Sequence, residues 1–147
     1  AKGLTWEDPP ASEAPFDNRF YWSRQTDGSL KERSLADVKE VDLDGKAILD
    51  VEGKQVVTPG LKSIWIIQTK TTAQEKLSKH DWMIVRNAEK STAIPSDITT
   101  YRDAIRTKCA SIETAINNCS SHADFIKLFD TPSDGSNPPI YDFPDEI

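Results

Sequence analysis

The chain has 147 residues, a net charge of -6 at pH 7 and a hydrophobic fraction of 37%, which is enough for one modest core. The negative charge argues against a nucleic-acid partner, because neutralising phosphates requires clustered Lys and Arg side chains. No apolar run reaches the roughly 18 residues that a membrane-spanning helix needs. We therefore expect neither a nucleic acid nor a membrane as partner.

The amino-terminal segment, residues 1–18, is predicted to be an extended arm, because its prolines fix φ and remove backbone donors. Residues 19–24 read RFYWSR and predict a short strand. Aromatic side chains are enriched in interface cores, so this region is open to two interpretations, a partner-binding patch and a local small core. The candidate partner-binding side chains here are Trp6, Phe16, Phe20, Tyr21 and Trp22.

The next segment contains two turn signals, Asp44-Gly45 and Glu52-Gly53, each of which precedes a short β-branched run, at residues 47–51 and 54–57. Such dipeptides supply the positive φ of tight hairpin turns, so we expect a β-hairpin. Calcium binding is the alternative interpretation. It is disfavoured because alignment of Gly45 with the EF-hand glycine leaves Val51 where the bidentate Glu belongs. The calcium ligands would be Glu40, Asp42, Asp44, Asp50 and Glu52.

Helical spacing begins after Pro59-Gly60 and predicts a helix over residues 61–77. Ser78, with Asp81 three residues later, resembles a capping box and predicts the start of a second helix. We expect Trp65 and Trp82, one on each helix, to lie in the core. The face of the first helix that we expect to pack consists of Leu61, Ile64, Trp65, Gln68 and Thr72, with Ile67 near its edge.

A third helix is predicted from Pro95, a residue that suits the first helical turn, to Cys119. Ser121 and Asp124 predict the cap of a short final helix, and residues 131–147 predict a Pro-rich extended arm. The stripe expected to pack on the third helix is Ile98, Tyr101, Ile105, Cys109, Ile112, Ile116 and Cys119. The candidate partner-binding side chains of the rear arm are Ile140, Tyr141 and Phe143.

The two cysteines are expected to be free thiols. Cys109 and Cys119 are ten residues apart on one helix, so their Cα atoms lie roughly 15 Å apart, beyond the ~7 Å limit of a disulfide. A zinc site that adds His122 lacks the four ligands it needs. The chain has no glycine-rich phosphate loop, no G-x-S-x-G and no H-E-x-x-H. We therefore expect no enzyme, no metal and no cofactor.

Residues 81–106, DWMIVRNAEKSTAIPSDITTYRDAIR, resemble the helical domain of tailed-phage tail-fibre assembly and tail assembly chaperone proteins. In that family a Trp-containing helix ends in an Arg and a Glu, an Ile-Pro turn follows, and a long helix carries a Tyr-Arg pair and a second Arg. The resemblance covers about residues 61–129, and Ser91 stands where many relatives have Gly. The positions that carry it are Trp82, Arg86, Glu89, Pro95, Tyr101, Arg102 and Arg106.

Two roles are open for the polar positions of this motif. An Arg or Tyr beside an apolar helix face can bridge to Glu89 or to helix-end carbonyls and fix the angle between helices. The same side chains are also typical anchors of protein interfaces. We favour the structural role, because the pattern falls on helix-packing positions.

We predict an α+β chain with four regions: 1–18 extended arm, 19–60 short strands and β-hairpin, 61–130 three to four helices, and 131–147 extended arm. The resemblance implies a structural, protein-binding component of a tailed-phage virion that joins neighbouring subunits through its arms. Its partners would be other tail or fibre proteins or copies of itself. It would be located in the tail region of the virion, and in the host cytoplasm during assembly. The alternative is a non-virion chaperone for tail or fibre assembly; a host-interfering regulator fits the acidic charge but has no motif behind it.

Overall fold

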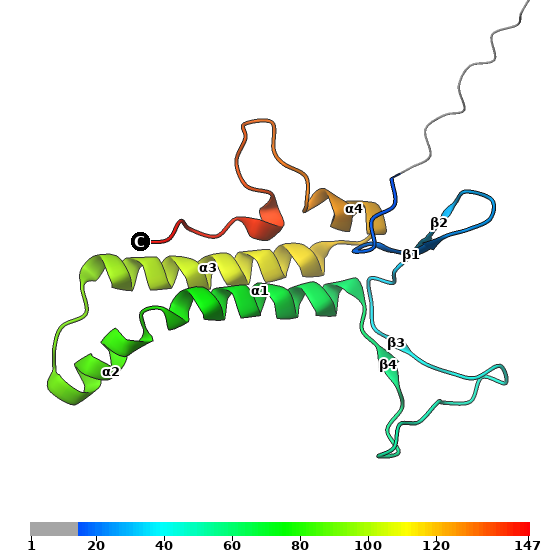
Figure 1. Cartoon of the computed structure of the whole chain (residues 1–147), viewed down its shortest axis with the longest axis horizontal. Helices are drawn as coiled ribbons and strands as arrows, with labels where there is room; N and C mark the ends of the chain where they lie inside the picture. Colours follow the sequence, from blue (N-terminus) through cyan, green and yellow to red (C-terminus); the bar gives the residue numbers. More distant parts are fainter. Residues whose placement is uncertain (1–14) are drawn as a thin grey trace, which may run out of the picture. The chain divides into compact units, whose positions relative to one another are not determined.

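The computed structural model describes residues 15–147, which divide into two compact units, one ending at Arg33 and the other running from Ser34 to Ile147. The described residues form four α-helices and two two-stranded antiparallel sheets (Figure 1). The expected α+β class is therefore confirmed. The predicted position of Trp6 in an amino-terminal arm lies outside the described residues.

The first unit contains one hairpin, in which β1 (Tyr21–Arg24) pairs with β2 (Leu30–Glu32). Its turn is fixed by the Asp27 carboxylate, which accepts hydrogen bonds from the Ser29 N–H at 2.9 Å and the Ser29 hydroxyl at 2.6 Å. Such Asx contacts hold a turn without help from the core. The strand expected over residues 19–24 is confirmed for its last four residues.

The second unit begins with a three-armed β element, residues 38–58, which we call the trefoil. One arm is its stem, where β3 (Val38–Lys39) pairs with β4 (Val57–Thr58). The other two arms are loops closed by single antiparallel bridges, Val41 to Ala47 and Leu49 to Gln55. The expected hairpin is thus one of three short arms. Figure 1 shows the two loops extending from the β3–β4 stem.

The three arms meet at a hub of three residues spaced eight apart. The Ile48 N–H donates to the Glu40 carbonyl at 3.1 Å, the Val56 N–H to the Ile48 carbonyl at 2.8 Å, and the Glu40 N–H to the Val56 carbonyl at 2.9 Å. These bonds form a closed ring. The spacing follows from an eight-residue repeat, VDLDGKAI over residues 41–48 and LDVEGKQV over residues 49–56.

Both loop tips use the same turn chemistry. The Asp42 carboxylate accepts hydrogen bonds from the backbone N–H groups of Asp44 and Lys46 at 3.0 and 2.9 Å. The Asp50 carboxylate accepts equivalent bonds from the next loop, both at 2.9 Å. Gly45 and its counterpart in that loop have φ of +77° and +79°, a region that favours glycine. Local chemistry therefore shapes each tip.

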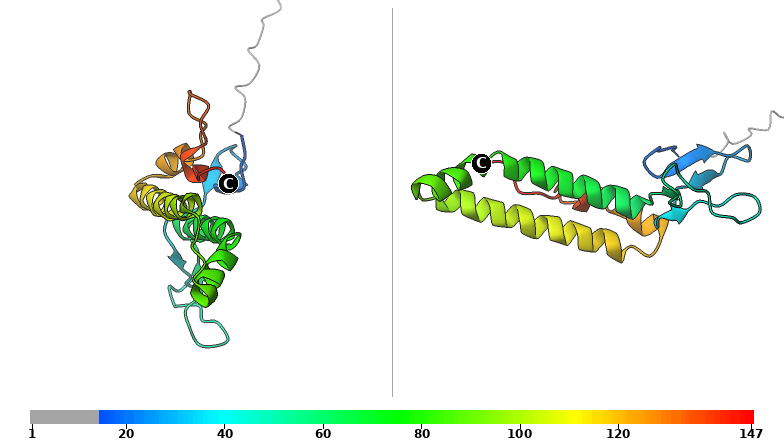
Figure 2. Two further views of the ribbon diagram at one scale, coloured as in Figure 1. Left: turned by 90° about the vertical axis from the view of Figure 1, so that its left-hand side faces the viewer. Right: turned by 90° about the horizontal axis from the view of Figure 1, so that it is seen from below.

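The helical part of the second unit is built on two long helices, α1 (Leu61–Ser78) and α3 (Ser96–Asn118), which run antiparallel and side by side (Figures 1 and 2). The stripe expected on α3 is confirmed, except that Cys109 is only half-buried. The buried members of the stripe are Ile98, Tyr101, Ile105, Ile112, Ile116 and Cys119.

The face expected to pack on α1 is partly wrong. Its fully buried residues are Leu61, Thr69 and Ala73, whereas Ile64 is 38% and Ile67 64% exposed. Residues 64–67 are four consecutive apolar residues, which surround the helix, so spacing alone cannot select a face. The choice is made by α3, which packs along α1.

Two shorter helices complete the fold, α2 (Asp81–Lys90) and α4 (His122–Lys127). The cap expected for α4 is confirmed, because the Asp124 N–H donates to the Ser121 hydroxyl at 3.1 Å. The cap expected from Ser78 is wrong. Ser78 is the last residue of α1 and its hydroxyl donates to the Glu75 carbonyl, while His80 occupies the N-cap position of α2.

The segment after α4 folds back onto its own helices. It contains a short 3-10 helix, η1 (Pro139–Tyr141), and the Ile140 N–H donates to the Leu128 carbonyl at 3.0 Å. Ile140 and Phe143 are 3% and 8% exposed. The rings of Trp65 and Phe129 meet edge to face at 4.7 Å, which adds an aromatic contact beside the segment.

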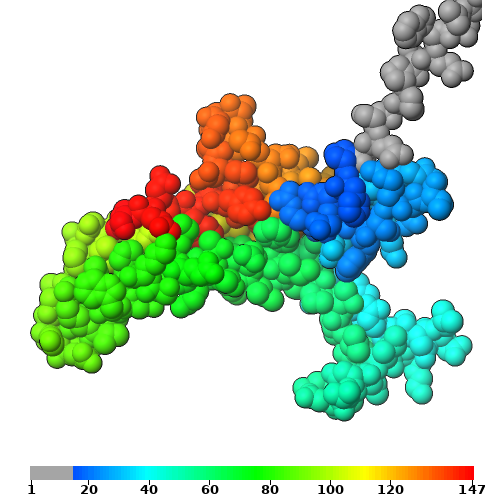
Figure 3. Space-filling view, viewed as in Figure 1, coloured from blue at the N-terminus to red at the C-terminus, as the bar shows by residue number. Residues whose placement is uncertain are grey.

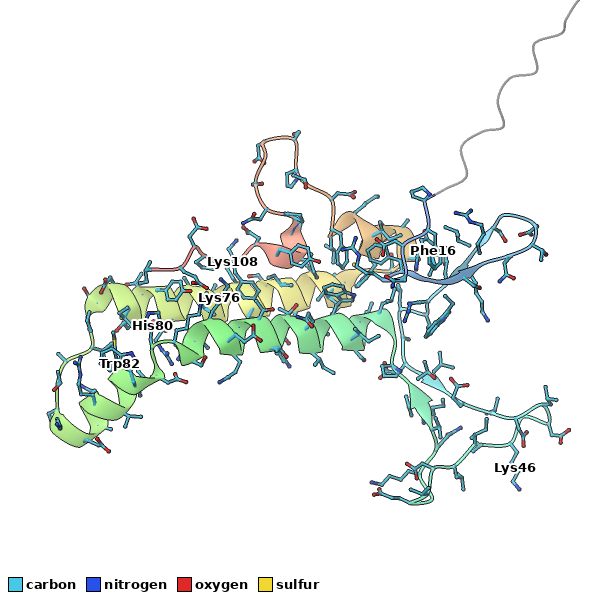
Figure 4. The ribbon with its side chains drawn as sticks, in the orientation of Figure 1. Phe16, Lys46, Lys76, His80, Trp82 and Lys108 are labelled. Carbon is cyan, nitrogen blue, oxygen red and sulfur yellow. The ribbon has the colours of Figure 1, made fainter. Side chains whose placement is uncertain are left out.

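Ion pairs fasten the end of this segment. Lys108 on α3 pairs with Asp142, and the Glu146 carboxylate lies 2.5 Å from the Lys79 ammonium and 3.9 Å from that of Lys76. The hydrogen bond from Lys79 lowers the pKa of Glu146. Figure 4 shows Lys76 and Lys108 beside the segment.

Candidate protein-interaction site

Arg102 is the only motif arginine of the described residues that is buried, at 7% exposure. Its guanidinium donates to the Leu77 carbonyl at 2.6 Å and to the Asp81 carboxylate at 2.9 Å. Leu77 lies in the last turn of α1 and Asp81 begins α2. Arg102 thus makes the kind of contact that the structural interpretation expects, a bridge to a helix-end carbonyl.

Tyr101 belongs to the same junction. Its ring is buried and meets the His80 ring edge to face, with centroids 5.6 Å apart. Burial, aided by the nearby Glu146 carboxylate, raises the pKa of the Tyr101 hydroxyl. Tyr101 therefore packs at the joint between α1 and α2.

The remaining motif side chains lie near the surface. Trp82 (Figure 4) is 54% exposed, so its expected position in the core is wrong. The Arg86 guanidinium lies 4.8 Å from the centroid of the Trp82 ring. Arg106 pairs with Asp103 one turn away at 3.0 Å. α2 contains no fully buried residue, which explains why a Trp there stays at the surface. Glu89 is exposed, and Pro95 is the N-cap residue of α3.

The aromatic candidates divide by burial. Phe20 is 4% exposed, and Ile140 and Phe143 are buried within the chain. A buried side chain has no surface to offer a partner, so the expected docking role of these three is wrong. Phe16, Trp22 and Tyr141 are 47%, 49% and 46% exposed, and Tyr21 is half-buried. The Arg33 guanidinium lies over the Trp22 ring, 3.9 Å from the ring centroid.

Exposed aliphatic side chains are concentrated on the trefoil instead. Leu43 and Val51, at the tips of the two loops, are 107% and 104% exposed. Sequence reasoning missed this surface, although the eight-residue repeat was a usable signal. Figure 3 shows the trefoil (cyan to blue-green) projecting from the rest of its unit, and Lys46 marks one tip in Figure 4. Its other exposed aliphatic residues are Val38, Val41, Ile48, Leu49 and Val57.

Two hollows flank α1. One, of about 430 Å³, lies between α1 and the carboxy-terminal segment and includes Trp65, Lys76 and Tyr141 in its lining. The other is an open groove of about 370 Å³ between α1 and α3. We call it the α1–α3 groove; it is lined by Lys70, Ala73, Gln74, Leu77, Arg106, Cys109, Ala110 and Glu113.

Within residues 15–147 no group of three or more His, Cys, Asp or Glu side chains could hold a metal ion. Both cysteines are free, as predicted. Burial raises the pKa of each thiol, and the Glu113 carboxylate raises that of Cys109 further. A raised pKa disfavours the reactive thiolate at neutral pH.

In the part of the chain that the structure describes, no helix has the length and apolar character needed to cross a bilayer. Comparisons with family models, with curated proteins and with solved structures give no match for this chain.

Proposed function

We propose that this chain is a structural, protein-binding component of a tailed-bacteriophage virion, located at the tail or its fibres, that joins neighbouring subunits. The observation that carries the binding role is the pair of fully exposed aliphatic tips, Leu43 and Val51. Each is held out by a turn whose Asp cap and glycine are built into the repeat. Apolar side chains displayed in this way are typical of interaction sites.

The distribution of apolar surface supports binding through the trefoil. Seven exposed large hydrophobic side chains lie within residues 38–58, whereas the stripe on α3 is closed by α1 and the carboxy-terminal segment. Burying one such side chain in a partner contributes about 1.5–3 kcal/mol. The trefoil, with Phe16, Trp22 and Tyr141 as further exposed candidates, replaces the rear arm as the proposed binding surface.

The tailed-phage part of the proposal rests on the resemblance of residues 61–129 to tail assembly proteins. The contact of Arg102 with Leu77 and Asp81 supports it, because it gives a packing reason for one of the motif positions. The alternative function is a chaperone that binds tail or fibre proteins in the infected cell and leaves before the particle matures. Both functions use the same exposed surface.

Location separates the two functions. Peptides of this chain would be quantified by mass spectrometry in gradient-purified mature particles and in lysate from infected cells. A fixed ratio to a tail protein in the particles supports the structural component. Detection in the lysate alone overturns it in favour of the chaperone, and detection in neither argues against both.

A variant pair then tests the surface. Leu43→Ser with Val51→Ser removes both tips, and we expect it to reduce incorporation into particles at least tenfold. Ile67→Ser is the matched control, because Ile67 is an exposed aliphatic residue outside the trefoil. Normal incorporation of the double variant would remove the trefoil from the proposed function.

A further inference from the structure

The two trefoil tips combine an apolar side chain with acidic neighbours. Leu43 lies between Asp42 and Asp44, and Val51 between Asp50 and Glu52. Residues 38–58 carry five carboxylates and three lysines, a net charge of -2. A surface that receives a tip must therefore offer a small apolar hollow with cations at its rim.

The α1–α3 groove of the same chain has this chemistry. Ala73, Leu77 and Ala110 give it an apolar lining with small side chains. Its lining includes two exposed cations, Lys70 and Arg106, and one carboxylate, Glu113. A second carboxylate, Asp103, pairs with Arg106 beside the groove. A volume of about 370 Å³ leaves room for an aliphatic side chain.

The rim cations are accessible although they already have partners. Lys70 lies 3.3 Å from Glu113 and is 60% exposed; Arg106 lies 3.0 Å from Asp103 and is 54% exposed. Both cations are more than half exposed, and ion pairs made by exposed cations contribute little to stability. An incoming Asp or Glu of a tip can therefore share these cations.

From this complementarity we propose that the trefoil of one copy docks a tip, Leu43 or Val51, in the α1–α3 groove of a second copy. The proposal deepens the proposed function, and rests on it, by naming another copy of this chain as one of the neighbours that it joins. Tip and groove are different surfaces, so the contact is heterologous. The copy that docks its tip keeps a free groove, and the copy that receives it keeps free tips, so the contact can repeat into a ring or an open row.

Disulfide trapping tests the contact directly, because the groove contains a native thiol, Cys109. Leu43→Cys and Val51→Cys variants would be incubated with oxidised glutathione at about pH 8.5, near the ordinary thiol pKa. One tip thiol and one Cys109 thiol lose two electrons and two protons and form a disulfide between copies. One oxidised glutathione takes these up and becomes two reduced molecules.

The expected result for at least one tip variant is a ladder of covalent dimers, trimers and longer species on a non-reducing gel. The ladder should fall at least tenfold when Cys109→Ala is added. Ile67→Cys, at an exposed site on α1, should give no ladder. Monomers alone from both variants, or tip-to-tip dimers that persist with Cys109→Ala, overturn the proposal.

A mixing experiment tests the heterologous geometry without cysteines. The tip variant, Leu43→Asp with Val51→Asp, keeps its groove; the groove variant, Ala110→Phe, keeps its tips and changes an exposed position. We expect wild type to sediment with a mass that rises with concentration, each variant to sediment as a monomer, and their equal mixture to give dimers that do not extend. Wild type that stays monomeric, or a mixture that stays monomeric, overturns the proposal.

The two proposals can fail separately. A chain present in particles at a fixed ratio but monomeric when purified overturns self-docking and leaves the proposed function standing with other neighbours. A chain that forms the Cys109-dependent ladder but is absent from particles supports the contact between copies and overturns the virion assignment.

Discussion

The Arg102 guanidinium donates a 2.9 Å hydrogen bond to the Asp81 carboxylate, and this contact joins α3 to the first residue of α2. The same guanidinium donates a 2.6 Å bond to the Leu77 carbonyl in the last turn of α1. A carbonyl at a helix end has no partner within its own helix. The Leu77 carbonyl also accepts from the His80 N–H at 3.1 Å, so the Arg102 side chain adds a further hydrogen bond at the end of α1 and joins it to the start of α2.

Replacement of this cation is expected to destabilise the fold. Arg102→Ala should lower the free energy of unfolding by about 2–3 kcal/mol, because it removes two charge-assisted hydrogen bonds from a buried position. Arg102→Lys should restore only part of this, since an ammonium lacks the planar fork. Urea denaturation at pH 7 measures both. The control is Arg106→Ala, at an exposed arginine with one surface ion pair. For this variant we expect the free energy of unfolding to change by no more than about 0.5 kcal/mol. Equal effects at the two arginines would contradict the prediction.

Ser91 is the C-cap residue of α2 and has φ of +54° and ψ of +26°. The left-handed region costs a residue with a Cβ about 1–2 kcal/mol, while glycine adopts it freely but loses more entropy on folding. We expect Ser91→Gly to raise the free energy of unfolding by about 0.5–1 kcal/mol, as measured by thermal and urea denaturation. Ser111→Gly, at an exposed position inside α3, should instead lower it by a few tenths of a kcal/mol or more. A loss of stability at both sites would argue against the left-handed cap.

The burial of Phe143 predicts that the carboxy-terminal segment is part of the core. Phe143→Ala should lower the free energy of unfolding by about 3 kcal/mol, the usual order for an aromatic side chain removed from a packed site. The reduction should appear as a lower urea midpoint without a change in slope. Ile147→Ala, at a side chain that is 61% exposed, should have an effect within about 0.5 kcal/mol. If Phe143→Ala were equally mild, the segment would not be packed in solution.

The two thiols should differ in reactivity and make stability depend on alkaline pH. Cys109 is half-buried and Cys119 buried, and burial raises the pKa of both. An unfolded thiol ionises near pH 8.5 and a folded one at higher pH. The buried, protonated thiols therefore stabilise the fold fully below about pH 8.5. This stabilisation is lost as the pH rises toward the pKa of the thiols in the folded chain.

Labelling with a disulfide reagent between pH 7 and 9.5 checks this. We expect Cys109 to react first, with a rate that increases with pH, and Cys119 to react on unfolding. Glu113→Gln should speed the labelling of Cys109, because the Glu113 carboxylate raises the pKa of that thiol. Glu75→Gln is the charge-matched control. Equal rates for the two cysteines in the folded chain would contradict the burial that the structure gives them.

The sequence by itself determined the features that depend on neighbours along the chain. The spacing of Ile98, Ile105, Ile112 and Ile116 predicted the buried stripe of α3, and Ser121 predicted the start of α4. The separation of the two cysteines on one helix predicted free thiols. Each of these follows from helix period or capping chemistry, which a short window of residues contains in full.

Tertiary structure decided which surfaces meet and which remain open. Four consecutive apolar residues left the packed face of α1 undetermined until α3 selected it, and Trp82 stayed exposed because α2 has little to pack against. The Pro-rich segment looked free because its anchors, Ile140 and Phe143, find their partners on helices distant in sequence. The eight-residue repeat of the trefoil is visible in the sequence, but its hub is a ring of hydrogen bonds among three separate stretches of the chain. Pairing between distant residues is set by the whole fold, so no local pattern reveals it.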